Sequence, residues 1–80
     1  MSLTQNFMAV SFRKSRNHIV PAEQRRATSA VSAERIAAAM AKRYIGAVAV
    51  SVMVEGETGD IAEPRILSQH GETINLFEDA

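Results

Sequence analysis

Cysteine is absent from this sequence of 80 residues, and so is tryptophan. Without cysteine, neither a disulfide nor a thiolate-ligated metal can stabilise the fold. A chain of this length buries only about 60% of the surface that it exposes when unfolded, so its core is thin. Association with a second copy is the simplest remaining source of stability. The lack of cysteine also points to a reducing compartment.

Long apolar runs are absent too. The longest, residues 45–54, is interrupted by Gly46 and Ser51 and is far shorter than the roughly 20 residues that a membrane-spanning helix needs. Residues 1–5 have neither the basic nor the apolar region of a signal peptide. We therefore expect a cytoplasmic protein that does not contact membranes.

Motifs of the common enzyme classes are missing. The four glycines match neither the dinucleotide-binding nor the phosphate-loop spacing, and no serine lies in a Gly-x-Ser-x-Gly elbow. His18 and His70 are the only imidazoles, and we interpret both as structural, because a catalytic zinc site uses three protein ligands. We predict no catalytic residue, cofactor, metal or small-molecule substrate. A deep pocket joining His70 to a carboxylate would favour an enzyme instead.

Charge is unevenly distributed although it sums to zero. Residues 1–45 hold eight basic and two acidic side chains, a net charge of +6, and residues 46–80 hold one basic and seven acidic ones, a net charge of −6. The simplest interpretation is that the two halves face each other across a sheet and partly neutralise one another. Four acidic residues form a loop without EF-hand spacing, which we interpret as solvated: Glu55, Glu57, Asp60 and Glu63.

The basic residues of the first half are a candidate contact surface for nucleic acid or an acidic partner. Clustered cations favour binding to a phosphate backbone, because their binding releases condensed counterions. Against this, the pI is about 6.7, whereas that of nucleic-acid-binding domains usually exceeds about 9, and no aromatic stacking platform is evident. The candidate residues are Arg13, Lys14, Arg16, Arg25, Arg26, Arg35, Lys42 and Arg43.

Hydrophobic periodicity predicts the first two strands. Residues 6–14 alternate with a period of two, as a half-buried strand does. A polar turn at 15–18 follows, in which Asn17 is suited to the left-handed conformation. Residues 19–24 return as a second strand, and Pro21 restricts that strand to a sheet edge because proline cannot donate to a ladder.

One amphipathic helix of roughly four turns follows. Thr28 or Ser29 caps its start, because a short hydroxyl side chain accepts hydrogen bonds from the free amides of the first turn. Gly46 is suited to end it in the left-handed conformation. Its exposed side carries Arg35 and Lys42. Its apolar arc consists of Ala30, Ala33, Ile36, Ala37, Met40, Ala41 and Tyr44.

Residues 47–54 form the central strand, with a valine face that is expected to meet the helix. The other face is small and uncharged, and we expect it to look outward beside edge strands that lack obvious protection. Residues 65–70 form the last strand. The apolar patch 74–77 tucks against the domain, and one alternative to self-association is that it caps the outward face. The valine face consists of Val48, Val50, Val52 and Val54. The small face consists of Ala47, Ala49, Ser51 and Met53.

The predicted fold class is α+β in the order β-β-α-β-β. A three- or four-stranded, mainly antiparallel sheet carries one amphipathic helix packed on one face. The strand order stays open, and the helix can itself be a crossover that makes one pair parallel. Residues 1–5 are expected to be a disordered N-terminus, 6–72 a single domain and 73–80 a C-terminal tail.

Several short segments carry a resemblance. They are Phe12-Arg13-Lys14, Ile19-Val20-Pro21, Ser32-Ala33-Glu34-Arg35-Ile36-Ala37, Gly46-Ala47-Val48-Ala49-Val50-Ser51, Thr58-Gly59-Asp60, Glu63-Pro64-Arg65-Ile66-Leu67 and His70-Gly71-Glu72. With these segments the chain resembles, over about residues 7–72, a group of short bacterial proteins of unknown function found mainly in alphaproteobacteria. It departs from them in its arginine-rich second strand and extra C-terminal residues. The resemblance implies one compact domain and adds no site.

Two functions follow from these features. The leading one is a small non-catalytic protein-interaction module, a homodimer or the partner of another protein. The alternative is a nucleic-acid-binding module that uses the basic first hairpin and the exposed face of the helix.

Overall fold

A computed structural model describes residues 3–77 of the chain. It contains four strands and one helix in the predicted order, which confirms the α+β fold class. No helix in the described range is long and apolar enough to cross a bilayer. The elements are β1 (Leu3–Ser15), β2 (His18–Ala27), α1 (Ala30–Met40), β3 (Gly46–Glu55) and β4 (Ile61–Gly71).

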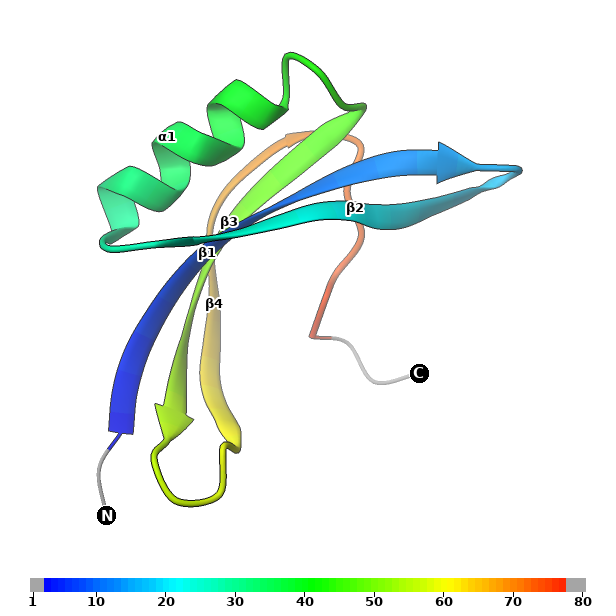
Figure 1. The fold of residues 1–80 in the computed structure, drawn as a ribbon. Helices are drawn as coiled ribbons and strands as arrows, with labels where there is room; N and C mark the ends of the chain where they lie inside the picture. Colours follow the sequence, from blue (N-terminus) through cyan, green and yellow to red (C-terminus); the bar gives the residue numbers. More distant parts are fainter. Residues whose placement is uncertain (1–2, 78–80) are drawn as a thin grey trace.

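The strands form one sheet in the order β2-β1-β3-β4, and all three pairings are antiparallel. The helix α1 connects β2 to β3, which lie on either side of β1, so the crossover creates no parallel pair (Figure 1). Leu3 pairs with Glu55, which places residues 3–5 in the sheet although we expected residues 1–5 to be disordered. Met1 and Ser2, like the last three residues of the predicted tail, lie outside the described residues.

The β1–β2 hairpin turns at Arg16 and Asn17. The left-handed residue is Arg16, with φ of 57°, so the assignment of this role to Asn17 is wrong. A positive φ at the first central residue alone is the φ pattern of a type II′ turn, which suits the twist of the flanking strands. β2 is an edge strand, as Pro21 predicted. Next to the pair of Phe12 and Pro21 the register shifts, and the buried hydroxyl of Ser11 accepts a hydrogen bond of 2.9 Å from the amide of Glu23 at this bulge.

The helix α1 begins at the Ser29 cap, whose hydroxyl accepts from the amide of Ser32 at 3.1 Å. It ends at Met40, earlier than predicted, and residues 41–43 continue as turns. Gly46 is the first residue of β3 and has no positive φ, so its predicted role as a left-handed helix terminator is wrong. Two amides after the helix, of Arg43 and Tyr44, instead satisfy the carbonyl of Met40.

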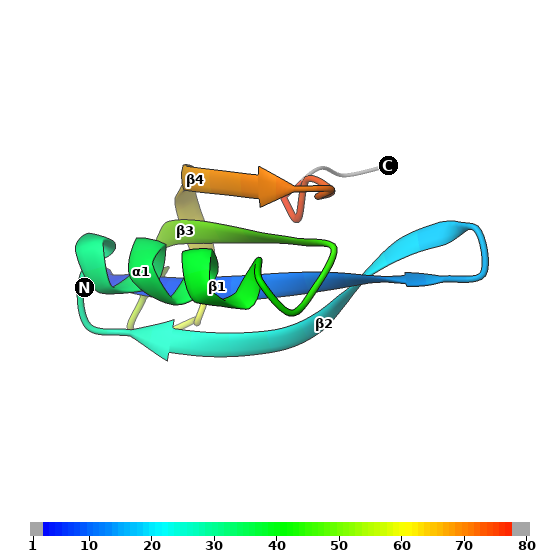
Figure 2. The same ribbon diagram turned by 90° about the horizontal axis from the view of Figure 1, so that it is seen from above.

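The helix covers the opposite face of the sheet from the one that we predicted. The helix packs on the small face, where Ala33, Ala37 and Met40 contact Ala9 and other small strand residues. The valine face lies on the other side, around Phe12, and Figure 2 shows the helix on one side of the strands only. A helix whose buried stripe is alanine gains most contact by lying close to a sheet, and branched valines would hold it away.

Met40 is expected to be the largest single contributor of α1 to the core. It is 1% exposed, so Met40→Ala should lower the free energy of unfolding by about 2–3 kcal/mol. Lys42→Ala, at an exposed position just after the helix, should change it by less than about 0.5 kcal/mol. Denaturant midpoints of the two variants make the comparison, and equal effects would contradict the packing described here.

Gly46 is required by a close approach of backbone rather than by its own φ. A Cβ atom at this position would overlap the carbonyl oxygen of Glu72, whose amide donates to Ile45 at 3.0 Å. Gly46→Asn should therefore destabilise by about 1–3 kcal/mol. Gly59, with φ of 77° and open space where a Cβ atom would lie, is the control, because asparagine tolerates this conformation. Thermal unfolding measures both variants, and an equal fall in the unfolding midpoint for Gly46→Asn and Gly59→Asn would contradict this explanation.

Candidate functional site

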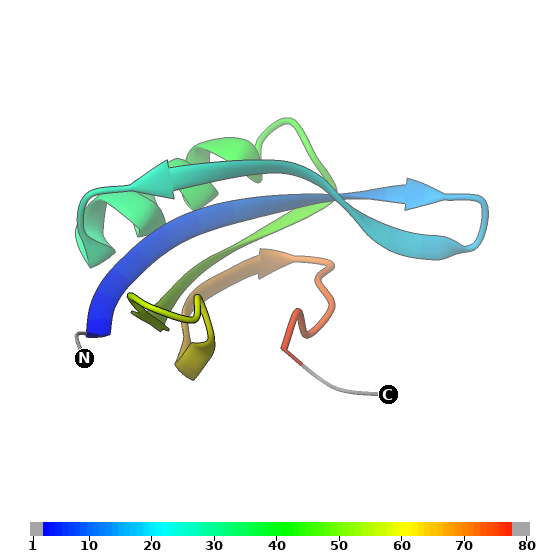
Figure 3. The same cartoon turned by 60° about the horizontal axis from the view of Figure 1, so that its bottom comes forward.

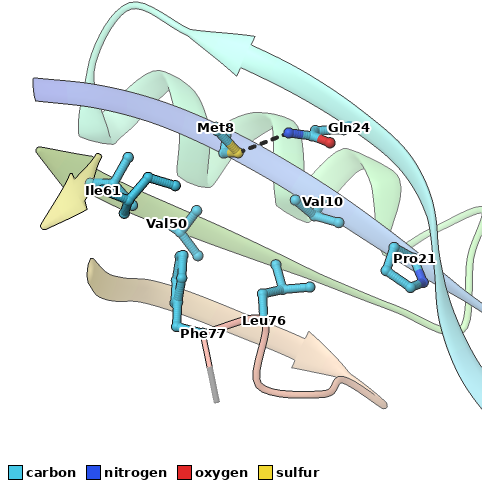
Figure 4. Close-up of a pocket in the computed structure, with 9 residues that line it drawn as sticks. Met8, Val10, Pro21, Gln24, Val50, Ile61, Leu76 and Phe77 are labelled. Atoms are coloured by element: carbon cyan, nitrogen blue, oxygen red, sulfur yellow. Dashed lines mark hydrogen bonds between the residues drawn. The ribbon is translucent and has the colours of Figure 1, made fainter. Parts of the chain in front are cut away.

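An apolar groove lies on the valine face, away from the helix. Its volume is about 250 Å³, and the side chains around it come from all four strands and from the segment after β4. Figure 4 shows Leu76 and Phe77 lying across from Val10 and Val50, with the amide of Gln24 donating to the sulfur of Met8 at 3.2 Å. The lining residues are Met8, Val10, Pro21, Gln24, Val50, Val52, Ile61, Leu76 and Phe77.

The C-terminal segment forms one wall of this groove. Leu76 and Phe77 pack against the cluster of Val10, Phe12, Val48 and Val50, so the patch at 74–77 does fold back on the domain. The face that it covers is the valine face and not the small face, because the helix already occupies the latter. Within the part of the chain that the structure describes, this segment covers only part of the face, and the groove is the part left open.

Large apolar side chains are exposed at the rim. Ile61 is 60% exposed and Ile66 is 37% exposed, and both pair with valines of β3. Residues paired directly across an antiparallel ladder share a face, so these isoleucines extend the apolar surface over β4. The chemistry of the groove is hydrophobic contact, and among the described residues that line it Gln24 is the one with a polar side chain.

Both sheet edges are interrupted, contrary to the expectation that they lack protection. On β2 the interruption is Pro21 with the neighbouring bulge. On β4 it is Pro64 beside Glu63, whose φ is 48°, and the register to β3 shifts in this region. Such breaks disfavour pairing with a strand of another chain. Association through the faces of the sheet is therefore favoured over association through its edges.

Glu23 organises the polar contacts beside the helix. Its carboxylate accepts from Arg25 at 3.0 Å and from the hydroxyl of Tyr44 at 3.1 Å, and Arg43 lies 3.7 Å away. The hydrogen bond from Arg25 and then that from Tyr44 lower the pKa of Glu23 below its ordinary value. The sequence offered no signal for this cluster, because its members are 2 to 21 residues apart.

The structure separates the eight basic candidates. Arg25 and Arg43 are paired with Glu23, and Arg26 donates to the side chain of Asn6 at 2.8 Å. The exposed Arg35 and Lys42 belong to α1 and the turn after it. The remaining three lie at the far end of the β1–β2 hairpin: Arg13, Lys14 and Arg16.

No ion pair joins the two charged halves in the described range. Both ion pairs found among residues 3–77 involve Glu23 and so lie within the basic half. The β1–β2 turn and the acidic β3–β4 loop lie at opposite ends of the sheet (Figure 3), because Leu3 of β1 pairs with Glu55 at the end where that loop begins. The molecule is 42 Å long and carries opposite charge at its two ends.

The histidines and carboxylates do not converge. His18 is exposed beside the hairpin turn, and the half-buried His70 on β4 has no hydrogen-bond partner for Nε2 within the described part of the chain. His70 lines neither the apolar groove nor a smaller polar hollow between Gln5 and Arg65. In residues 3–77 no three histidine, aspartate or glutamate side chains are grouped to hold a metal ion. In the acidic loop, Glu55 accepts from the amide of Glu57 at 3.2 Å.

Comparisons with protein-family models, with curated proteins and with solved structures found no match. The resemblance to short bacterial proteins therefore stays a prediction.

The stabilising effect of Glu23 should depend on pH. Because its pKa is lowered in the folded state, its contribution is complete above its ordinary pKa and is lost as the pH falls through the lowered value. Glu23→Gln should therefore reduce the free energy of unfolding more at pH 7 than at pH 3, as measured by urea unfolding. Glu34→Gln, at an exposed helix position, is the control and should have little effect at either pH. An equal loss for Glu23→Gln at both values would contradict the cluster described.

Proposed function

We propose that this protein is a small, non-catalytic interaction module that associates with a second copy through its valine face. The observation that carries this proposal is the apolar groove, which, within residues 3–77, neither the helix nor the segment after β4 closes. Soluble monomers rarely leave large contiguous apolar patches open. The lack of cysteine supports a cytoplasmic location.

The shape of the domain supports a second copy as the occupant. Its shortest dimension is 15 Å, and its broad side measures 42 by 29 Å. That side has room for the roughly 800 Å² that each partner buries in a standard interface. In a twofold arrangement the groove of one copy receives the apolar rim of the other, with Ile61 and Ile66 as contacts. A thin core without disulfide or metal gains most from such burial.

A single charge at the rim tests this proposal. Ile61→Glu places a carboxylate at the proposed interface, and sedimentation at micromolar concentration should then give the monomer mass of 8.7 kDa instead of twice that value. Val31→Glu is the matched control, because Val31 is equally exposed, at 64% against 60%, but lies on the helix. This control should sediment as a dimer.

Two results would overturn the dimer. One is a monomer mass for the intact chain at every accessible concentration. The other is a dimer that Ile61→Glu and Val31→Glu affect alike. If the intact chain is a monomer and a chain ending at Gly71 associates, the C-terminal segment is the cover of the valine face, and self-association is not the function.

Nucleic-acid binding through all eight basic residues has weaker support. Three of them already have partners, and those of the helix region are separated from those of the hairpin. An enzyme has weaker support still, because neither hollow joins His70 to a carboxylate.

A further inference from the structure

The β1–β2 hairpin continues beyond the body of the sheet as a two-stranded arm. β3 pairs with β1 only as far as Phe12, opposite Gly46, whereas β1 and β2 stay paired up to Ser15 and His18. Figures 1 and 2 show the arm, residues 13–20, projecting past the helix and the other strands. A ribbon of two strands gains little stability of its own. Its length therefore calls for a reason outside the fold.

The arm carries positive charge on both faces and at its tip. Arg13 and Lys14 are neighbours on a strand, so they point to opposite faces, and Arg16 lies in the turn. All three are exposed, and in the described residues none of them takes part in an ion pair or a side-chain hydrogen bond. The acidic loop lies at the other end of the molecule and cannot compensate them.

This arrangement matches a groove with anionic walls on both sides. The major groove of B-DNA is about 12 Å wide and about 8.5 Å deep, and it admits a two-stranded ribbon. Three residues per strand, 13–15 and 18–20, extend roughly 10 Å, which is enough to reach the floor. Inside the groove, Arg13 and Lys14 would face phosphates on opposite walls, and the short amide of Asn17 would be carried at the tip.

We propose that the arm is a docking element for duplex DNA and enters the major groove. Single strands fit less well, because their recognition relies on aromatic stacking, and residues 13–20 contain no phenylalanine, tyrosine or tryptophan while Phe12 at the base is fully buried. Duplex RNA fits less well because its major groove is too narrow for protein elements. No residue of the arm lines the groove on the valine face, so this inference is independent of self-association.

Salt-dependent binding to labelled duplex DNA tests the proposal. Fluorescence anisotropy titrations between about 50 and 200 mM salt should give a log–log slope of about −2.7 for three phosphate contacts. Replacing Lys14 and Arg16 by glutamine should leave a slope of about −0.9 and weaken binding at the lowest salt. The matched control replaces Arg35 and Lys42 by glutamine, which removes the same residue types and the same charge from the helix region, and should keep the wild-type slope.

Two further controls test whether the variants fold and which class of partner the arm binds. Arg16→Asn keeps a residue suited to the left-handed turn while removing its charge. It should change the slope from about −2.7 to about −1.8 with an unchanged unfolding midpoint. Duplex DNA should bind more tightly than single-stranded DNA, duplex RNA or polyglutamate of equal charge. Equal slopes for the arm and helix variants, no binding to duplex DNA at the lowest salt, or tighter binding to polyglutamate would each overturn the proposal.

Discussion

The close contact between α1 and the small face of the sheet is the interaction on which the rest of the structure depends. Alanines meet alanines there, and Met40 fills the space that they leave at the end of the helix. Small side chains let the backbones approach, so dispersion contacts accumulate over a short helix of 11 residues. Because the helix covers the small face, the valine face can be covered only by another part of the chain or by a partner.

Residues 72–77 supply part of that cover, and the groove is the part of the face that these described residues leave open. Leu76 and Phe77 reach the valine cluster, while Ile61 and Ile66 stay exposed at the rim. The bulge at Ser11 and the Pro64 region interrupt the two sheet edges at the same time. The surface that remains for a partner is therefore a face with hydrophobic chemistry and, separately, an arm with cationic chemistry.

Much of this fold could be predicted from local sequence, since period-two alternation, the Ser29 cap and Pro21 each act within a few residues. The assignment of faces could not. Alternation tells which residues share a face, but the choice between the two faces depends on how closely a helix can approach. The role of Gly46 could not be predicted for a similar reason, because the atoms that exclude a side chain there belong to Glu72, 26 residues away. The candidate groove needed both the correct face and the path of the C-terminal segment, so neither periodicity nor composition identified it. The basic arm was visible in the sequence, although its separation from the other basic residues was not.

The central position of β1 has a consequence for how the chain folds. Its partner β2 follows after a two-residue turn, whereas its other partner, β3, pairs Ala49 with Ala9 across about 40 residues. Local hairpins form in about 1–10 μs, and the distant pairing must await the closure of a longer loop. During that interval the inner edge of β1, with Val10 and Phe12, is an unpaired apolar strand. Arg13 and Lys14 follow this stretch directly, and charge that flanks such a strand discourages its pairing with other unfolded chains.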